Sequence, residues 1–393
     1  MKQITLLASQ SIQTPSVAWT GLLPIVILAA AAVLLLTICS LFPNRITTKL
    51  LSIYTALASL AALITTFPLW GKVQNSSEGP YSTLAGAFGI DGFSLFVTML
   101  ITTIVIIVCP LLSTFLEREN VSGPEPYVLL LLAATGGMIM SGANDFIILF
   151  LGIEVLSISS YILVAMNSRR IQSQEAGLKY FVLGAFASGF LLYGIALLYG
   201  ATGSTSFSAI KAFTQQVELT NDALLLAALA LLIVGLAFKV AAVPFHFWSP
   251  DVYQGSPTPF VAFMASAVKV SGFAAILRVL YVTLGEYRAD WQPVIYAIAI
   301  ASLLTGSLLA IVQTDLKRML AYSSISHAGY LLVGTQAASD QGVKAVLFYL
   351  ATYAFMVIGS FTVVAINAGK SGTETSLDSI AGLATKKPLL AIS

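Results

Sequence analysis

The sequence predicts an all-α polytopic membrane protein with about eleven transmembrane helices. Of its 393 residues, 58% are hydrophobic and only 9% are charged, whereas soluble globular proteins carry roughly 25% charged residues. Apolar runs of about 20 residues, long enough to cross the hydrocarbon core of a bilayer, recur along the whole chain. The net charge of +2 provides neither a polybasic surface for nucleic acid nor an acidic tail.

The predicted spans follow one another with short connections, which indicates one helical bundle without a soluble domain. They are 22–42, 48–70, 91–116, 127–143, 145–167, 177–201, 222–243, 258–283, 292–313, 319–337 and 342–367. The fourth and fifth spans are nearly contiguous and predict a tight hairpin at Gly142–Asp145. The first run lacks the pattern of a cleaved signal peptide, so we expect a retained span.

Basic residues are distributed unequally between the two sides of the predicted bundle. Loops after odd-numbered spans contain eleven Lys and Arg residues, and loops on the other side contain six. Basic loops remain in the cytoplasm, so we expect the N-terminus on the outer side and the odd loops in the cytoplasm or its equivalent. Two of the nineteen basic residues, Lys239 and Lys269, are left inside predicted spans.

Two short pairs of sequences indicate a weak internal repeat. "SISSYILVA" (157–165) resembles "SISHAGYLLVG" (324–334), and "EAGLK" (175–179) resembles "DQGVK" (340–344). The copies are five spans apart, an odd number, so they face opposite sides of the membrane. Inverted repeats of this kind are typical of transporters, although short apolar matches also arise by chance.

Three ionisable residues lie well inside predicted spans: Glu154, Lys239 and Lys269. Such a group costs about 2.5 to 3.5 kcal/mol at mid-bilayer on insertion scales and is a functional hypothesis by default. The alternatives are an inert Glu154–Lys239 ion pair or side chains that reach the interface, which suits Lys239 better than the other two. Because burial and pairing move a lysine pKa in opposite directions, a lysine that alternates between the two states can exchange a proton.

The segment "VAAVPFHFWSPDVYQGSPTP" (240–259) contains four prolines and directly follows Lys239. Proline removes a backbone donor and interrupts a helix, and irregular backbone at membrane depth is tolerated only inside protein or beside a polar cavity. The span that carries Lys239 is therefore predicted to be discontinuous. An ordinary exposed loop would explain Asp251 and Gln254 but not the apolar residues before them.

The only two histidines, His246 and His327, lie at or within spans. Each is either a satisfied buried hydrogen-bonding group or a proton carrier, and the relay interpretation is stronger for His327, near the middle of its span. Ser323, Ser324 and Ser326 could hold water beside it, whereas Asp91 and Asp145 are expected to be solvated helix caps. The sequence contains no phosphate loop, CxxC pair, paired axial histidines or catalytic triad. We therefore predict no catalytic residue, bound cofactor or metal in this chain.

Three segments resemble the antiporter-like subunits of proton-pumping NADH:quinone oxidoreductase, complex I. They are "FLGIEVLSISSYIL", "FKVAAVPFHFWSPDVYQGSPTPFVAF" and "QTDLKRMLAYSSISHAGYLL". The form "PDVYQGSPTP" is most similar to the type called N in bacteria, which has counterparts in the complexes of mitochondria and plastids. The likeness covers nearly the whole chain from about residue 90 onward.

The resemblance implies a fourteen-helix fold with inverted five-helix repeats and two broken helices. It divides the chain into N-terminal helices (1–126), a first repeat (127–284, with a broken helix near 240–257) and an incomplete second repeat (285–393). The family's second broken helix would follow "TKKPLLAIS", so we expect a fragment or a C-terminally truncated sequence. The proton path implied by the family includes Glu154, Lys239 and Lys269, and His327 falls where polar residues link its two halves. His246, beside the predicted helix break, is a further candidate for proton transfer from its position alone.

The resemblance also implies a non-redox, proton-translocating subunit of the membrane arm, driven by quinone reduction in partner subunits. NADH, FMN, iron–sulfur clusters and quinone are then expected on those partners, and the contacts of this chain would be neighbouring antiporter-like subunits, lipid and protons. The location expected is a bacterial plasma membrane, with a thylakoid or mitochondrial inner membrane as alternatives. Two other functions remain open, namely a subunit of a multi-subunit cation/proton antiporter and a structural membrane scaffold.

Overall fold

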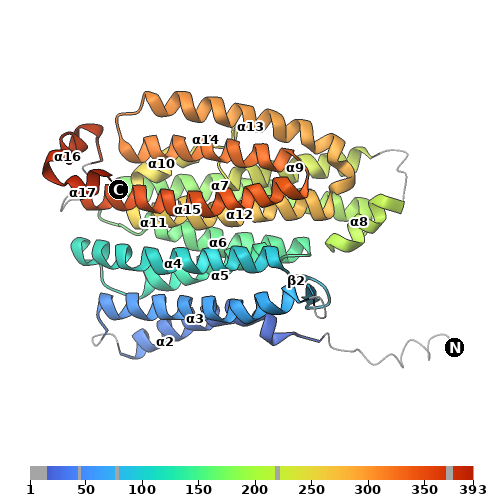
Figure 1. The fold of residues 1–393 in the computed structure, drawn as a ribbon, viewed down its shortest axis with the longest axis horizontal. Coiled ribbons are helices and arrows are strands. Elements are labelled where there is room, and N and C mark those ends of the chain that lie inside the picture. Colours follow the sequence, from blue (N-terminus) through green and yellow to red (C-terminus); the bar gives the residue numbers. More distant parts are fainter. Residues whose placement is uncertain (1–15, 43–45, 76–78, 217–221, 369–374, 393) are drawn as a thin grey trace.

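The helices lie along one common direction in a flattened bundle, with α2 and α3 at one side and α13 and α14 at the other (Figure 1). The computed structural model describes residues 16–42, 46–75, 79–216, 222–368 and 375–392. Three of the basic residues behind the predicted orientation, Lys2, Arg45 and Lys370, lie outside these ranges. The fold class is confirmed, since each of the eleven predicted spans corresponds to a helix or to a continuous helical run.

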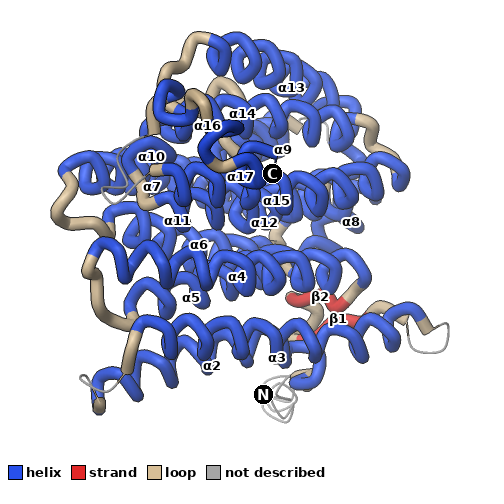
Figure 2. Tube along the Cα trace, turned by 60° about the vertical axis from the view of Figure 1, so that its left-hand side comes forward, coloured by secondary structure: helices blue, strands red, loops and turns tan. Residues whose placement is uncertain are grey.

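The first three long helices are α2 (Trp19–Leu41), α3 (Thr48–Gln74) and α4 (Gly92–Glu119). Between α3 and α4 lies an antiparallel hairpin, β1 (Tyr81–Thr83) and β2 (Phe88–Ile90), which the hydropathy pattern does not predict (Figure 2). Asp91 starts α4 with a capping box, because its side chain accepts from the Ser94 amide while Ser94 Oγ accepts from the Asp91 amide. The predicted cap at Asp91 is therefore present.

The remaining elements complete the bundle in chain order. They are α5 (Glu125–Gly142), α6 (Phe146–Ala165), α7 (Ile171–Thr202), α8 (Phe207–Gln216), α9 (Ala223–Lys239), α10 (Trp248–Gly255), α11 (Thr258–Phe263), η1 (Met264–Val268), α12 (Lys269–Leu277), η2 (Arg278–Thr283), η3 (Gly285–Tyr287), α13 (Arg288–Ile311), α14 (Leu316–Gln336), α15 (Asp340–Asn367), η4 (Leu377–Ile380), α16 (Leu383–Lys386) and α17 (Pro388–Ile392). Among the described residues, nine helices are long and apolar enough to cross a membrane. The shorter α9 and the more polar α14 correspond to the other two predicted spans.

In one helical run, Thr258–Thr283, every residue from 258 to 280 is buried by its neighbours. It passes from α11 through a π-helical segment (η1) into α12, and then through a second π-helical segment (η2). Wide π turns inside α-helices occur frequently at functional sites. The first of them ends directly before Lys269, so the most buried run of the bundle contains both an irregular turn and a lysine.

The helix that carries Lys239 is broken, as predicted. It ends at Lys239, Ala241 adopts a left-handed conformation (φ 56°), and helical structure resumes only at Trp248. Two backbone groups freed by the break find side-chain partners. The Val243 amide donates to Ser302 Oγ at 2.9 Å, and Trp248 Nε1 donates to the Phe238 carbonyl at 3.1 Å.

The hairpins α5–α6 and α13–α14 are built alike and make the inverted repeat visible in the fold. Asp145 and Asp315, 170 residues apart, each begin the second helix, form an isolated bridge to a serine and accept a hydrogen bond from a threonine hydroxyl. In both hairpins a glycine packs directly on the backbone of the facing helix, Gly136 on α6 and Gly306 on α14. A side chain at either position would clash with a backbone nitrogen, so both contacts require glycine.

The register of this repeat differs from the one that the short sequence matches indicate. Counted from the two caps, Glu154 corresponds to Ser324 and Ser157 to His327, whereas the sequence match places Ser157 opposite Ser324. The copies are inverted, because the beginning of α14 lines the same cavity as Asn167 and Arg170, which follow the end of α6. Corresponding positions of the two repeats therefore carry different polar side chains: an acid corresponds to a serine, and a serine to a histidine.

Candidate functional site

Lys239, the last residue of α9, is buried with 6% of its surface exposed. Its Nζ donates a hydrogen bond to Ser157 Oγ on α6 at 2.7 Å. Ser157 in turn donates to the Ile153 carbonyl of its own helix. The ion pairs formed by the described residues do not include Lys239. The break in the helix thus places an ammonium group against a neutral hydroxyl.

Glu154 lies on α6 one turn before Ser157 and is half-buried. Its Oε1 accepts a hydrogen bond from Ser188 Oγ of α7 at 2.5 Å. The direct Glu154–Lys239 ion pair considered from the sequence is not formed, although the charge of Glu154 acts on Lys239. The carboxylate and the ammonium are therefore neighbours with separate hydrogen-bond partners.

Lys269, the first residue of α12, is buried with 3% of its surface exposed. Its Nζ donates to the Ser324 hydroxyl at 2.6 Å and also to the Ser324 backbone carbonyl of α14. The Tyr353 hydroxyl of α15 donates to Ser324 Oγ at 2.8 Å, and the Tyr353 ring lies 5.5 Å from the lysine nitrogen. Like Lys239, this lysine contacts a serine, and the described residues provide it with no ion-pair partner.

His327, on the same helix as Ser324, is half-buried. Its Nδ1 forms a 2.6 Å hydrogen bond with the Tyr349 hydroxyl, and its ring centroid lies 4.9 Å from that of Tyr353. Tyr353 therefore contacts both the histidine and the residue that accepts from Lys269. Ser326, expected beside His327, instead bonds Ser307 of α13.

His246 lies in the broken segment and is buried. Its Nδ1 has no hydrogen-bond partner among the described residues, and its ring packs on Phe247 at 4.6 Å. The contacts of the described residues do not connect His246 with Lys239 or Lys269. Its role in proton transfer stays a prediction without a contact in its favour.

The end of α9, which carries Lys239, packs on a glycine of α12, the helix that begins with Lys269. Gly272 of α12, one turn after Lys269, faces the side chain of Lys239: a methyl group there would lie 3.6 Å from Lys239 Cγ and 2.7 Å from Val240 Cγ1. The absence of a side chain lets the end of α9 approach α12 closely. Lys239 and Lys269 thus lie on two helices that are in close contact at Gly272.

A third polar network surrounds Arg278, which lies near the end of the predicted span 258–283 and counts among the basic residues that set the orientation. Arg278 is buried with 4% exposed, at the start of η2. Its Nη2 pairs with Asp91 Oδ2 at 2.7 Å, Nη1 donates to Asn144 Oδ1 at 3.0 Å, and Nε donates to the Ser141 carbonyl. Asp91 is therefore both a helix cap and the counterion of a buried arginine. In the sequence, the position of Asp91 at the edge of a span is the one signal that could have indicated this double role.

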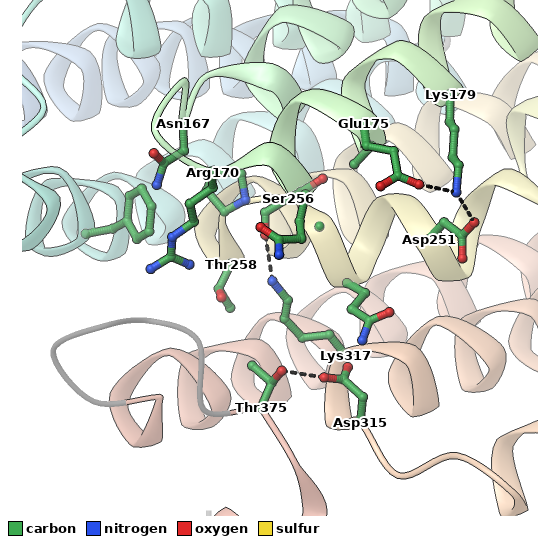
Figure 3. A pocket seen from close by; sticks show the side chains of 16 residues that line it. Asn167, Arg170, Glu175, Lys179, Asp251, Ser256, Thr258, Asp315, Lys317 and Thr375 are labelled. Atoms are coloured by element: carbon green, nitrogen blue, oxygen red, sulfur yellow. Dashed lines mark hydrogen bonds and ion pairs between the residues drawn. The ribbon is translucent and has the colours of Figure 1, made fainter.

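At the other end of the bundle, a polar cavity of about 430 Å³ lies where several helix ends meet (Figure 3). It is lined by residues from α7, α10, α11 and α14 and from the adjoining loops. Asp251 lies at its edge, where it bonds Lys179 at 2.8 Å and Arg318 at 2.6 Å. Partial burial alone would raise the pKa of Asp251, but the hydrogen bonds from these two cations outweigh it and lower that pKa.

These features define a polytopic transport protein of the antiporter-like type, with inverted repeats and lysines in the membrane interior. Among the described residues, no group of three or more His, Cys, Asp and Glu side chains could hold a metal ion. The family profile described as "NADH:quinone oxidoreductase/Mrp antiporter, TM" matches residues 143–393. The chain belongs to this family.

Curated relatives agree with this assignment. The chain is 40% identical over 433 aligned positions to NADH-quinone oxidoreductase subunit N 3 of Streptomyces griseus, covering 97% of this chain and 76% of that relative. It is 41% identical over 312 positions to NADH-quinone oxidoreductase subunit N of Trichlorobacter lovleyi, covering 79% and 64%. The chain thus spans about two thirds to three quarters of these proteins.

Solved structures show the same fold. A chain of respiratory complex I from Thermus thermophilus with bound Aureothin matches with a TM-score of 0.75 and 34% identity, over 94% of this chain and 76% of that one. A chain of the Mrp complex from Dietzia sp. matches with a TM-score of 0.81 at 21% identity, over 95% and 69%. At that identity the second likeness shows the fold alone.

Proposed function

We propose that the chain is the proton-translocating subunit N of the membrane arm of a proton-pumping NADH:quinone oxidoreductase. The observation that carries the proposal is a pair of buried lysines, Lys239 and Lys269, whose hydrogen-bond acceptors are neutral. A structural lysine in a membrane interior is normally paired with an acid, because an unpaired buried charge is costly. Serine partners stabilise the charge only partly and leave each amine able to lose its proton.

In this proposal protons move between groups that the fold already brings close together. Lys239 exchanges a proton on the α6 side, where Glu154 lies beside Ser157, and Lys269 does so on the α14 side, beside Ser324. A change in charge near Glu154 alters the balance between charged and neutral Lys239, since opposite charges favour the ammonium. Tyr353 and His327 extend the polar path beyond Lys269, and His246 remains the least supported member.

The subunit itself carries out no redox step under this proposal. NADH, FMN, iron–sulfur clusters and quinone belong to partner subunits, and neighbouring antiporter-like subunits flank this chain in the bilayer. The bias of basic residues supports an outer location for the N-terminus and a cytoplasmic location for the cavity end. Bacterial relatives support a plasma membrane location.

A cation/proton antiporter subunit is the second candidate, because the Mrp complex shares the fold. The higher identity to subunit N proteins favours complex I. Proton transport that requires sodium, and not NADH oxidation alone, would support the antiporter. A structural membrane scaffold is the third candidate function.

Replacement of Lys239 or Lys269 by methionine in the intact complex tests these functions. Proton uptake is measured in inverted membrane vesicles with NADH as donor, beside NADH oxidation and the amount of assembled complex. Lys344→Met, an exposed lysine near the start of α15, is the control. We expect normal assembly with strongly reduced pumping for the two buried lysines. Wild-type pumping in both variants would favour the scaffold.

A further inference from the structure

One lysine that the sequence pattern assigns to a loop is buried at the wall of the polar cavity. Lys317, the second residue of α14, has 4% of its surface exposed, and its Nζ donates to the Ser256 carbonyl at 2.6 Å (Figure 3). Its ammonium has three N–H donors. Among the described residues, the Ser256 carbonyl accepts one of them. The ion pairs formed by these residues do not include Lys317.

The inverted repeat shows that this type of hairpin also forms without a lysine at the corresponding position. The equivalent position of the first repeat, two residues after the capping Asp145, is Ile147, an exposed apolar side chain. A cation at the second position of a helix is also unfavourable, because the helix N-terminus is itself positive. Lys317 is therefore energetically unfavourable at a position where the corresponding hairpin, α5–α6, has the apolar Ile147.

The cavity is large enough to hold water beside this lysine. Its volume of about 430 Å³ exceeds by roughly tenfold the ~30 Å³ that one water occupies in the liquid. Its wall is formed largely of polar and charged side chains, and it opens at the end of the bundle where the loops of α6–α7 and α13–α14 meet. The charged residues that line it are Arg170, Glu175, Lys179, Asp251, Asp315 and Lys317.

Polar groups continue from the cavity toward the membrane interior. Ser324 follows Lys317 by seven residues on the same face of α14, about 10 Å along the helix axis. The buried Tyr253 of α10 lies beside the hydroxyls of Ser324 and Ser249. The Ser249 hydroxyl is buried with no hydrogen-bond partner among the described residues. Because buried polar groups are normally satisfied, an internal water beside Ser249 would connect its hydroxyl with those of Tyr253 and Ser324.

We infer that this cavity is the aqueous mouth of the proton path and that Lys317 is its proton-uptake residue. A proton passes from cavity water to the Lys317 amine, and from there along Tyr253, Ser249 and Ser324 to Lys269. Each step breaks one N–H or O–H bond and forms another, with no other reactant. The inference rests on the proposed proton-translocating function and adds the site at which protons enter.

Three substitutions at Lys317 in the intact complex separate proton uptake from a structural role. Lys317→Met removes the amine, Lys317→Arg keeps a permanent cation that does not deprotonate, and Lys317→His keeps a group that titrates. We expect the methionine and arginine variants to lose most proton pumping in NADH-energised inverted vesicles. The histidine variant should retain part of it, with an optimum shifted to lower pH. The control is again Lys344→Met.

The outcomes distinguish this inference from the function on which it rests. Loss of pumping in Lys269→Met together with full pumping in Lys317→Met overturns the uptake role alone. Full pumping in both overturns the proposed function as well. Full pumping in Lys317→Arg shows that a fixed charge is sufficient and also overturns uptake.

A labelling measurement keeps the inference testable if the Lys317 variants fail to assemble. Thr258→Cys places a thiol in the cavity wall, whereas Val261→Cys places one in the adjacent turn of α11, away from it. A water-soluble maleimide should react with the first thiol and not with the second, in a background with both native cysteines replaced by alanine. Equal protection of both thiols shows that the cavity is closed to reagents dissolved in water, which contradicts an aqueous mouth and overturns the inference.

Discussion

Lys239 and Ser157 form a direct hydrogen bond of 2.7 Å between the end of the broken helix and the middle of α6. Glu154, one turn away on the same helix, bonds Ser188 instead. A hydroxyl stabilises an ammonium less than a carboxylate does, since ionised partners give the stronger bonds. The arrangement leaves Lys239 close to a carboxylate but not bound to it.

Ser157→Ala should therefore impair Lys239 more than its small volume change suggests. Removing the acceptor leaves a buried donor unsatisfied, at a cost of about 1–3 kcal/mol, and favours the neutral amine. We expect reduced NADH-driven proton uptake with normal assembly. Ser159→Ala is the matched control, because among the described residues that hydroxyl bonds only the Val155 carbonyl of its own helix. Equal pumping in the two variants would contradict the role of the Lys239–Ser157 bond.

Glu154→Gln should lower proton pumping without loss of the complex. The amide oxygen of glutamine can still accept the hydrogen bond from Ser188, so packing between α6 and α7 is kept while the charge that acts on Lys239 is removed. Pumping and NADH oxidation in vesicles are compared with those of Glu286→Gln, an exposed acid outside this region. A glutamine variant with unchanged pumping would show that the charge does not influence Lys239.

Much of the fold follows from the sequence because membrane physics leaves few choices. Long apolar runs must become helices, and prolines after Lys239 must interrupt one. The inverted repeat is also visible in the sequence, but its register is not, since the matched letters "SIS" fall at 157 in one copy and 324 in the other. Structural equivalence is set by the caps Asp145 and Asp315, which short apolar matches cannot reveal.

The polar partners could not be predicted, because they depend on contacts between distant segments. The sequence offers Glu154 as the obvious partner for Lys239, whereas the structure provides Ser157. Arg278 and Lys317 lie near span ends and count as topology residues by sequence, yet both are buried. Charge spacing along a chain shows which residues are costly, but only packing shows which groups surround them.

Asp91→Asn should destabilise the protein by disrupting the Arg278 network. The pair lies at 2.7 Å with side-chain exposures of 5% for Arg278 and 30% for Asp91. Breaking a fully buried pair costs about 3–5 kcal/mol, and partial exposure of the aspartate reduces this to about 1–3 kcal/mol. Thermal unfolding of the complex in detergent measures the effect against Asp290→Asn, an exposed acid. Identical unfolding temperatures would contradict a structural role for the pair.

Gly272→Ala tests whether the close contact between α9 and α12 positions Lys239. The added methyl group would come within 2.7 Å of Val240 Cγ1 and 3.6 Å of Lys239 Cγ, so the Val240 side chain or the end of α9 must shift. Overpacking of this kind costs about 1–3 kcal/mol, and the shift should draw Lys239 away from Ser157 and lower proton pumping. Gly189→Ala is the matched control, because nothing lies within 4 Å of a methyl group at that helical position. If Gly272→Ala pumps as well as Gly189→Ala in vesicles with equal amounts of assembled complex, Lys239 does not depend on this contact for its position.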